Sequence, residues 1–377
     1  MSEWKKYTLE DVIERIVDNR GKSAPTSMSN YQPIIEINAL GERKINYNVI
    51  RKYVSKTTYD TWFRSGHPQI GDILFSTVGT IGLVSIMQQN IGCIAQNVVA
   101  IRTNHLLNNM YLYYWFNNAT TKRYLQNLNI GGVQPSIKLP HLLKTPILLP
   151  PLTEQKRIAD ILSAIDDKIE LNRRINANLE QQAQALYKSW FVDDKKDDWE
   201  EKRLDDIISI YDSQRKPLSG QQREKMEKLY PYYGAASLMD YVDNYLFDGI
   251  YLLLGEDGTV SDSEGFPMLQ YVWGKFWVNN HAHILQGKNG FTTESLYILL
   301  KQTNVSSIVT GAVQPKISQA NLKSVPITMP PINLLNQYNN IIKPIFNQIR
   351  INHNQIQQLS TLRDTLLPKL MNGETTV

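Results

Sequence analysis

The chain has 377 residues, a formal net charge of +4 and a single cysteine, Cys93. That length allows two or three domains, each with its own core. One cysteine excludes an intrachain disulfide and a cysteine-based zinc site, and it fits a reducing cytosol. The opening residues lack the apolar core of a signal peptide, and no apolar run is long enough to span a bilayer. We therefore expect a cytoplasmic protein whose charge permits nucleic-acid binding without requiring it.

An internal duplication is the dominant feature of the sequence. The recurring segments are GGVQPSI (131–137) and GAVQPKI (311–317), the Pro-Pro pairs at 150–151 and 330–331, and Trp-x4-Leu-x-Asp-x-Ile at 4–13 and 199–208. The residues between these matched ends diverge. This pattern indicates a common framework that carries two different recognition surfaces.

Residues 1–150 and 193–330 each mix short apolar or alternating runs with turn signals, which predicts two compact mixed α and β domains. Helical periodicity at 107–127 and at 294–309 comes just before the repeated turn in each copy. The predicted strands lie within 71–82, 97–101, 251–260 and 270–278.

Each domain is followed by a long segment with helical periodicity, 151–192 and 331–373. Apolar residues recur there at alternating steps of four and three, the spacing of a coiled-coil seam. We predict an α+β fold in which two long antiparallel coiled-coil helices separate two mixed α/β domains related by a pseudo-twofold duplication. The matched seam positions are Ile161, Ile165, Ile169, Asn172, Leu179 and Leu186 in the first segment, and Ile341, Ile345, Ile349, Asn352, Leu359 and Leu366 in the second.

Asn172 and Asn352 lie at the midpoints of the two predicted helices. If the helices pack antiparallel about a pseudo-twofold axis, these side chains meet near that axis, where a polar pair fixes register at some cost in stability. The alternative is two solvated side chains on slightly rotated helices. Pro344, inside the second helix, is expected to bend that helix or to delay its regular start.

A search for catalytic motifs finds no P-loop, no HExxH and no glycine-rich dinucleotide fingerprint. The Pro-Pro pairs lack the acceptor and aromatic residues of the amino-methyltransferase motif, so we assign them to helix entry. His281 and His283 would point the same way on a strand, but no third ligand accompanies them at a recognisable spacing, and a packed or hydrogen-bonded pair is favoured over a metal site. GEDG (255–258) is interpreted as a tight turn. We therefore expect no catalytic residue and no metal in this chain.

Loops rich in amide and hydroxyl groups, beside basic and aromatic residues, suit nucleic-acid binding. Asn and Gln can bond adenine edges, Arg and Lys guanine or phosphate, and Ser or Thr either. Gln134 and Gln314 recur beside the same turn, which favours a shared framework or phosphate role, whereas discriminating residues should lie where the copies differ. The candidate DNA-binding residues are Arg20, Lys22, Ser76, Thr77, Thr80, Asn97, Gln134, Lys138, Arg215, Lys216, Tyr233, Asn279, Asn280, His281, Gln314 and Lys316.

The order and duplication of these segments resemble the specificity subunit of type I restriction-modification systems. The resemblance covers essentially the whole chain, including GDILFSTVGTIG (71–82), WVNNHAHIL (277–285), the paired VQP turns and PPLTEQKRIADIL (150–162). It implies target-recognition domains at 1–150 and 193–330, each reading one half of a bipartite DNA sequence. It also implies conserved spacer helices at 151–192 and 331–373.

The same resemblance implies partners for the chain. It predicts that the chain binds double-stranded DNA and two modification subunits, which use S-adenosylmethionine to methylate adenine, and through them restriction subunits that use ATP and Mg. No cofactor is then expected in this chain itself. A helix of roughly 38 residues would span about 57 Å and could act as a ruler between half-sites. The second helix has INLLNQYNN in place of LTEQKRIAD after the prolines, which puts its partner contacts in doubt.

Two alternatives come from other classes of protein. The first is a duplicated coiled-coil scaffold whose globular domains bind proteins rather than DNA, which the divergent, amide-rich loops disfavour without excluding. The second is a self-sufficient methyltransferase, against which the missing cofactor loop and acceptor motif argue.

Overall fold

The structure of the chain is a computed structural model that describes residues 4–131, 134–311 and 313–375. It divides into two compact units: unit 1 comprises Met1–Leu171 and Gln355–Val377, and unit 2 comprises Asn172–Asn354. The contacts thus divide the chain within both long helices rather than at their starts. Gly132, Val133 and Ala312 of the repeated turns lie outside the described residues.

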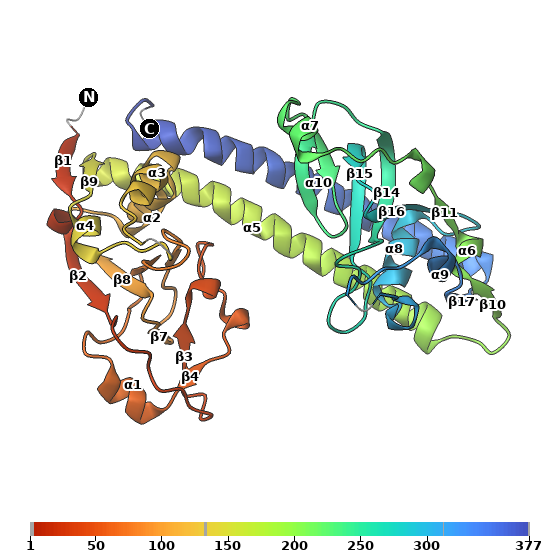
Figure 1. Ribbon diagram of the computed structural model, residues 1–377, viewed down its shortest axis with the longest axis horizontal. Coiled ribbons are helices and arrows are strands. Elements are labelled where there is room, and N and C mark those ends of the chain that lie inside the picture. The colour runs from red at the N-terminus through yellow and green to blue at the C-terminus, as the bar shows by residue number, and fades with distance from the viewer. Residues whose placement is uncertain (1–3, 132–133, 312, 376–377) are drawn as a thin grey trace. The chain divides into compact units, whose positions relative to one another are not determined.

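An antiparallel four-stranded sheet with the order β2-β8-β5-β6 forms the centre of unit 1 (Figure 1). Its strands are β2 (Ile13–Asp18), β5 (Ile73–Ser76), β6 (Val84–Ile86) and β8 (Val98–Thr103). Apolar side chains cover both faces of this sheet: Phe75 packs into the cluster that holds Tyr111, whereas its neighbour Leu74 packs into the cluster that holds Ile35. All residues of β5 are consequently buried.

The other elements of unit 1 surround this sheet. A short sheet has the order β4-β3-β7, and β1 pairs with β9. The elements are β1 (Lys5–Thr8), β3 (Gln32–Ile35), β4 (Tyr53–Val54), β7 (Cys93–Ile94), β9 (Pro146–Leu149), α1 (Lys56–Trp62), α2 (Asn109–Asn117), α3 (Ala119–Asn127) and α4 (Leu139–Leu143). The predicted helix at 107–127 is therefore two helices, because the extended backbone of Asn118 ends α2 while its side chain caps α3.

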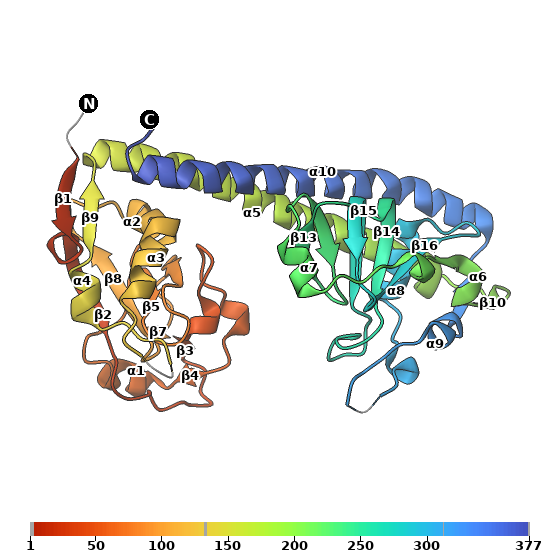
Figure 2. The ribbon, with the colours of Figure 1, turned by 45° about the horizontal axis from the view of Figure 1, so that its top comes forward.

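Unit 2 contains a six-stranded sheet with the order β11-β16-β14-β15-β12-β13, seen beside α8 in Figure 2. Its strands are β11 (Ile208–Ile210), β12 (Tyr230–Tyr233), β13 (Leu238–Val242), β14 (Phe247–Gly255), β15 (Leu269–Val278) and β16 (Ala282–Gly287). The other elements are β10 (Glu200–Arg203), β17 (Pro326–Met329), α6 (Leu204–Ile207), α7 (Gly220–Glu224), α8 (Thr293–Lys301) and α9 (Gln319–Lys323). The neighbours β11-β16-β14 match β2-β8-β5 of unit 1 in order and antiparallel pairing.

The repeated ends of the sequence form the same closure in both units. In unit 1, β1 pairs antiparallel with β9, and Lys5 lies opposite Leu149. In unit 2, β10 pairs antiparallel with β17, and Glu200 lies opposite Met329. The matched segments are therefore those that bring the two ends of each domain together.

The two long helices are α5 (Leu152–Lys188) and α10 (Ile332–Met371). They are antiparallel in unit 2, because later residues of α10 lie beside earlier residues of α5. Tyr338 donates a hydrogen bond to Ala183 O, and Asn352 donates to Asn176, which lies one heptad before Ala183. In unit 1, α5 also packs on the last turns of α10, and Arg363 donates to Asp166 at 3.0 Å. Pro344 does not delay the helix, because α10 begins twelve residues before it and continues through it.

Most predicted seam positions are buried or half-buried. Ile341 is a correction, because its side chain is 40% exposed while the next residue, Ile342, faces the core. Near the middle of the helices, Asn352 donates to Asn176 Oδ1 at 2.8 Å. Asn176 lies one helical turn after Asn172, and the Asn172 side chain is itself buried. Among the described residues, no helix combines the length and apolar character that crossing a membrane requires.

Candidate nucleic-acid interface

Three loops of unit 1 meet at the end of β5. The backbone nitrogen of Thr77 donates to Asn97 O at 2.9 Å, which ties the loop after β5 to the loop before β8. Ile137 N donates to Thr77 O at 2.9 Å, and Gly79 N donates to Pro135 O at 2.8 Å. These bonds attach the repeated VQP turn to the same place. We call residues 77–80, 95–97 and 134–138 the first three-loop frame.

Unit 2 repeats this arrangement bond for bond. Glu256 N donates to His281 O at 2.8 Å, Ile317 N to Glu256 O at 2.8 Å, and Gly258 N to Pro315 O at 2.9 Å. Residues 256–259, 279–281 and 314–318 therefore form the second three-loop frame. The equivalences place Glu256 where unit 1 has Thr77, and His281 where unit 1 has Asn97.

A glycine holds the repeated turn in both frames. A Cβ atom on Gly131 would lie 1.8 Å from Gln134 O, and one on Gly311 would lie 2.2 Å from Gln314 O. Gly311 also has a φ of +89°, which disfavours other residues. The turn brings Gln134 and Gln314 to exposed positions beside the neighbouring loops.

The interior of the first frame is made by hydroxyl groups. Ser76 Oγ donates to Thr80 O at 2.6 Å and accepts from Leu83 N at 2.8 Å. The side chains of Ser76 and Thr77 are fully buried. We therefore correct the prediction of DNA contact for these two residues: they shape the loop, and Thr80 and Asn97 are the members of this group nearer the surface.

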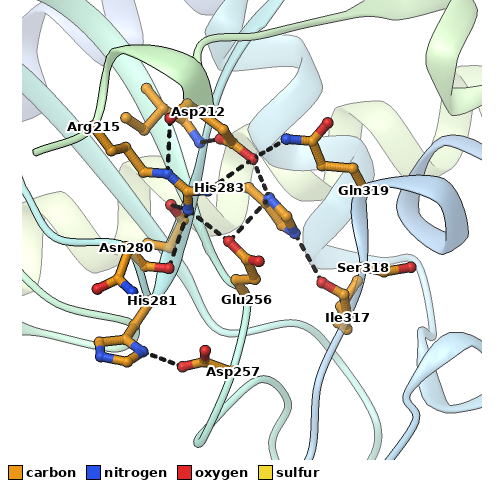
Figure 3. Close-up of polar contacts among 12 residues, drawn as sticks. Asp212, Arg215, Glu256, Asp257, Asn280, His281, His283, Ile317, Ser318 and Gln319 are labelled. Atoms are coloured by element: carbon orange, nitrogen blue, oxygen red, sulfur yellow. Dashed lines mark hydrogen bonds and ion pairs between the residues drawn. The ribbon is translucent and has the colours of Figure 1, made fainter. Parts of the chain in front are cut away.

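The interior of the second frame is an ion-pair network (Figure 3). Arg215 Nη1 donates to Glu256 Oε2 at 2.5 Å and to Ala282 O at 2.8 Å, and the Arg215 side chain is only 14% exposed. Lys316 Nζ lies 3.3 Å from the other Glu256 oxygen. Arg215 is thus largely held inside the domain, where it fixes the loop that carries Asn280 and His281.

His283 connects this network to the core. Its Nε2 donates to Ile317 O at 2.8 Å, and its Nδ1 lies 2.6 Å from Asp212 Oδ2. Burial alone would raise the pKa of the Asp212 carboxyl, but the hydrogen bond and charge of His283 hold it below its usual range. Burial alone would also raise the pKa of Glu256, but the bond from Arg215, the charges of His283 and Arg215 and the bond from Lys316 together lower it.

Asp212, Glu256 and His283 are near enough to one another to be tested as a metal site. Two cationic side chains, Arg215 and Lys316, already bond the carboxylates, and the His283 nitrogens already face protein oxygens. A divalent ion would have to displace these partners, so the donor set fits a salt-bridge network better than a metal. His281 and His283 do not act as a pair: His281 is exposed, and its Nδ1 is hydrogen-bonded to the Asp257 carboxylate.

The remaining candidates differ in exposure. Asn279 is buried, and its Oδ1 accepts from His281 N at 2.9 Å, so its prediction is corrected to loop shaping. Tyr233 is half-buried against Phe276, and Arg20 is half-buried and bonded to Asp18. The exposed candidates are Lys22, Thr80, Gln134, Lys138, Lys216, Asn280, His281, Gln314 and Lys316.

Sequence reasoning did not identify Asp212, Asp257, Glu256 or Gln319 as parts of the site. Gln319 Nε2 donates to Asp212 Oδ2 at 2.6 Å, across 107 residues of sequence. The segment GEDG, predicted as a tight turn, comprises the last residue of β14, an isolated bridge from Asp257 to Lys316 and a bend at Gly258, and its carboxylates face Arg215 and His281. A comparison of the two copies could have pointed to Glu256 and Asp257, because these charged residues replace the neutral Thr77 and Val78 in the equivalent loop.

Comparison with known proteins agrees with this duplicated architecture. The family model described as "Type I restriction modification DNA specificity domain" matches residues 1–181 and 196–361. The chain belongs to this family, and it is a non-catalytic specificity subunit of the type I kind.

Three relatives illustrate the similarity. The type I restriction enzyme MjaIX specificity subunit of Methanocaldococcus jannaschii is 28% identical, over 93% of this chain and 85% of that protein. A putative specificity subunit of Haemophilus influenzae, S.HindORF215P, is 35% identical over 35% of this chain and 34% of its own length. The crystal structure of a type I S subunit from M. genitalium has the same fold, with a TM-score of 0.60 and 18% identity over 98% of this chain and 96% of that one.

Proposed function

We propose that the chain reads a bipartite sequence in double-stranded DNA, with one half-site read by each of the domains at 1–150 and 193–330. The repeated three-loop frame carries this proposal. Its backbone bonds are the same in both units, whereas the side chains differ at equivalent positions, as the exposed His281 and the half-buried Asn97 do. A constant frame with variable donors and acceptors suits the recognition of two different groove edges.

We also propose that the chain positions two modification subunits, and through them restriction subunits that use ATP and Mg. The modification subunits would use S-adenosylmethionine to methylate adenine. The frames supply hydrogen-bonding and charged groups, and the partners supply the chemistry. Adenine must leave the duplex to be methylated, and a subunit that holds the DNA on both sides of the base supports that step.

The test is long-read mapping of methylated adenines in cells that express the chain with its modification subunit, compared with cells that lack the chain. A bipartite motif that requires the chain supports the proposal. Methylation that persists without it favours the scaffold alternative instead. Exchange of residues 14–130 with those of a relative should then alter one half-site only.

The long helices are proposed to set the distance between the half-sites. Deletion of one heptad from α5, Asn176–Gln182, keeps the phase of the seam and shortens the helix by about 10 Å. We expect a changed spacer and two unchanged half-sites in the methylation map. Asn176→Ala is the matched control, because it removes the bond to Asn352 without changing the helix length.

A further inference from the structure

The tip of the second VQP turn carries an exposed apolar side chain. Val313 is 99% exposed, more than any other large apolar residue of the described chain. The residues beside it are polar and exposed: Gln314 follows directly, and Lys316 lies at the base of the turn. The turn therefore presents one aliphatic group together with Gln314 and Lys316, whose side chains are suited to base edges and phosphates.

The base of this turn is firmly held. Thr310 N donates to Lys316 O at 2.8 Å, and Lys316 N donates to Thr310 O at 2.7 Å. Gly258 N donates to Pro315 O at 2.9 Å from the neighbouring loop. Because these bonds fix the base of the turn, the position of Val313 at its tip follows from the fold of the frame.

Single exposed apolar residues are common on protein surfaces and need no explanation by themselves. This one is repeated, however: the sequence has Val133 at the matching position of the first copy, between Gly131 and Gln134. Elsewhere in the frames the side chains have changed, as at the half-buried Asn97 and its equivalent, the exposed His281. An apolar residue retained in both copies points to a role shared by the two half-sites, in contrast to discrimination between them.

We propose that Val313 is a wedge that enters the stacked bases of the second half-site and loosens the base step beside the adenine to be methylated. Apolar side chains placed between base pairs unstack them and kink the duplex. A base that is already loosened is easier to extrude from the duplex. This inference rests on the proposed function and adds a mechanical task to it.

The test uses the chain assembled with its modification subunits and a target duplex that carries 2-aminopurine beside the adenine of the second half-site. Wild-type protein and Val313→Ile, which retains a branched apolar side chain, should raise the 2-aminopurine fluorescence on binding. Val313→Ser should not raise it. Methylation of that half-site should slow on the order of tenfold in Val313→Ser, because the cost of unstacking is no longer offset.

A mismatch opposite the target adenine separates a wedge from a merely structural residue. Since the mismatched base is already unstacked, it should restore methylation by Val313→Ser to nearly the wild-type rate. Equal fluorescence and rates for Val313→Ser and wild type would overturn the wedge. So would a failure of Val313→Ser to assemble with the modification subunits, which would place Val313 at a protein interface. Absence of any bipartite methylation by the wild-type complex would instead refute the proposed function, and the wedge with it.

Discussion

The two three-loop frames have the same backbone and different interiors. In the first, Thr77 and its neighbour Ser76 form a neutral hydroxyl interior, whereas in the second Glu256 takes the place of Thr77 and brings Arg215 and His283 with it. The three hydrogen bonds that the two frames share are made by backbone groups. Because backbone bonds do not depend on side-chain identity, the geometry of the frame persists while its chemistry changes.

The largest expected effect comes from breaking the network that only the second frame has. Arg215→Met leaves Glu256 and Asp212 with fewer partners in a nearly buried site, and the free energy of unfolding of unit 2 should fall by about 3 kcal/mol. Urea denaturation followed by a probe in unit 2 measures this loss. Adding Glu256→Gln should recover part of it.

A surface pair in unit 1 provides the matched control. Lys56 and Asp60 form an exposed ion pair on one helix, and Lys56→Met should leave the urea midpoint of unit 1 almost unchanged, because water and salt screen such pairs. A loss in Arg215→Met as small as this would show that the buried network contributes little to the second frame.

The same network should make unit 2 sensitive to acid. The pKa values of Asp212 and Glu256 are lowered in the folded state, so their contribution is complete above the usual carboxyl range near pH 4. It is lost as the pH falls through the lowered folded values. Urea midpoints of unit 2 between pH 7 and pH 3 should therefore fall more steeply in the wild type than in the Arg215→Met, Glu256→Gln double variant.

The second effect tests the shared turn. In Gly311→Ala the new Cβ would lie 2.2 Å from Gln314 O at a φ of +89°, so we expect a loss of about 3 kcal/mol or a displaced turn. Reading of the second half-site should fail while the first half-site is kept. Gly220→Ala is the control, because nothing lies within 4 Å of its Cβ position. An intact second half-site in Gly311→Ala would mean that the turn is not needed for reading.

The third effect tests whether the side chains that differ between the two frames read different bases. The double variant His281→Asn, Asp257→Val gives the second frame the residues that unit 1 has at Asn97 and Val78. We expect the second half-site to relax or change at one or two positions, at about 1–3 kcal/mol for each lost base contact. Long-read methylation mapping reports both half-sites at once. An unchanged motif would remove the exposed His281–Asp257 pair from the set of base-reading groups.

The smallest effect concerns the hydroxyl interior. Ser76→Ala removes one bond to Thr80 O and one from Leu83 N at a fully buried site, and should cost unit 1 about 1–2 kcal/mol. Thermal denaturation of unit 1 measures it. The opposite change, Gly255→Ser at the equivalent position of the second frame, should not be tolerated, since a Cβ at Gly255 would lie 2.8 Å from Thr259 O.

The sequence predicted the elements whose signal is local or periodic. The long helices follow from the seam. Strand β5 lies within its predicted apolar run, and β8, β14 and β15 overlap theirs but extend beyond them. Side-chain direction was harder: Ser76 belongs to a strand that is covered on both faces, so the usual alternation of buried and exposed residues is absent. The cluster of Asp212, Glu256 and His283 was missed because its members are far apart in the chain and meet only through the sheet order.

The paired strands at the ends of each domain have a genetic consequence. Because β1 lies beside β9 and β10 lies beside β17, the chain enters and leaves each domain at one place. A recombination event between two related genes, with crossovers in the matched segments, would replace everything between those strands and preserve the closure itself. The reading frame of the gene and the long helices would stay intact. New sequence preferences could thus be acquired in one step, by exchange of whole modules, without passing through poorly folded intermediates.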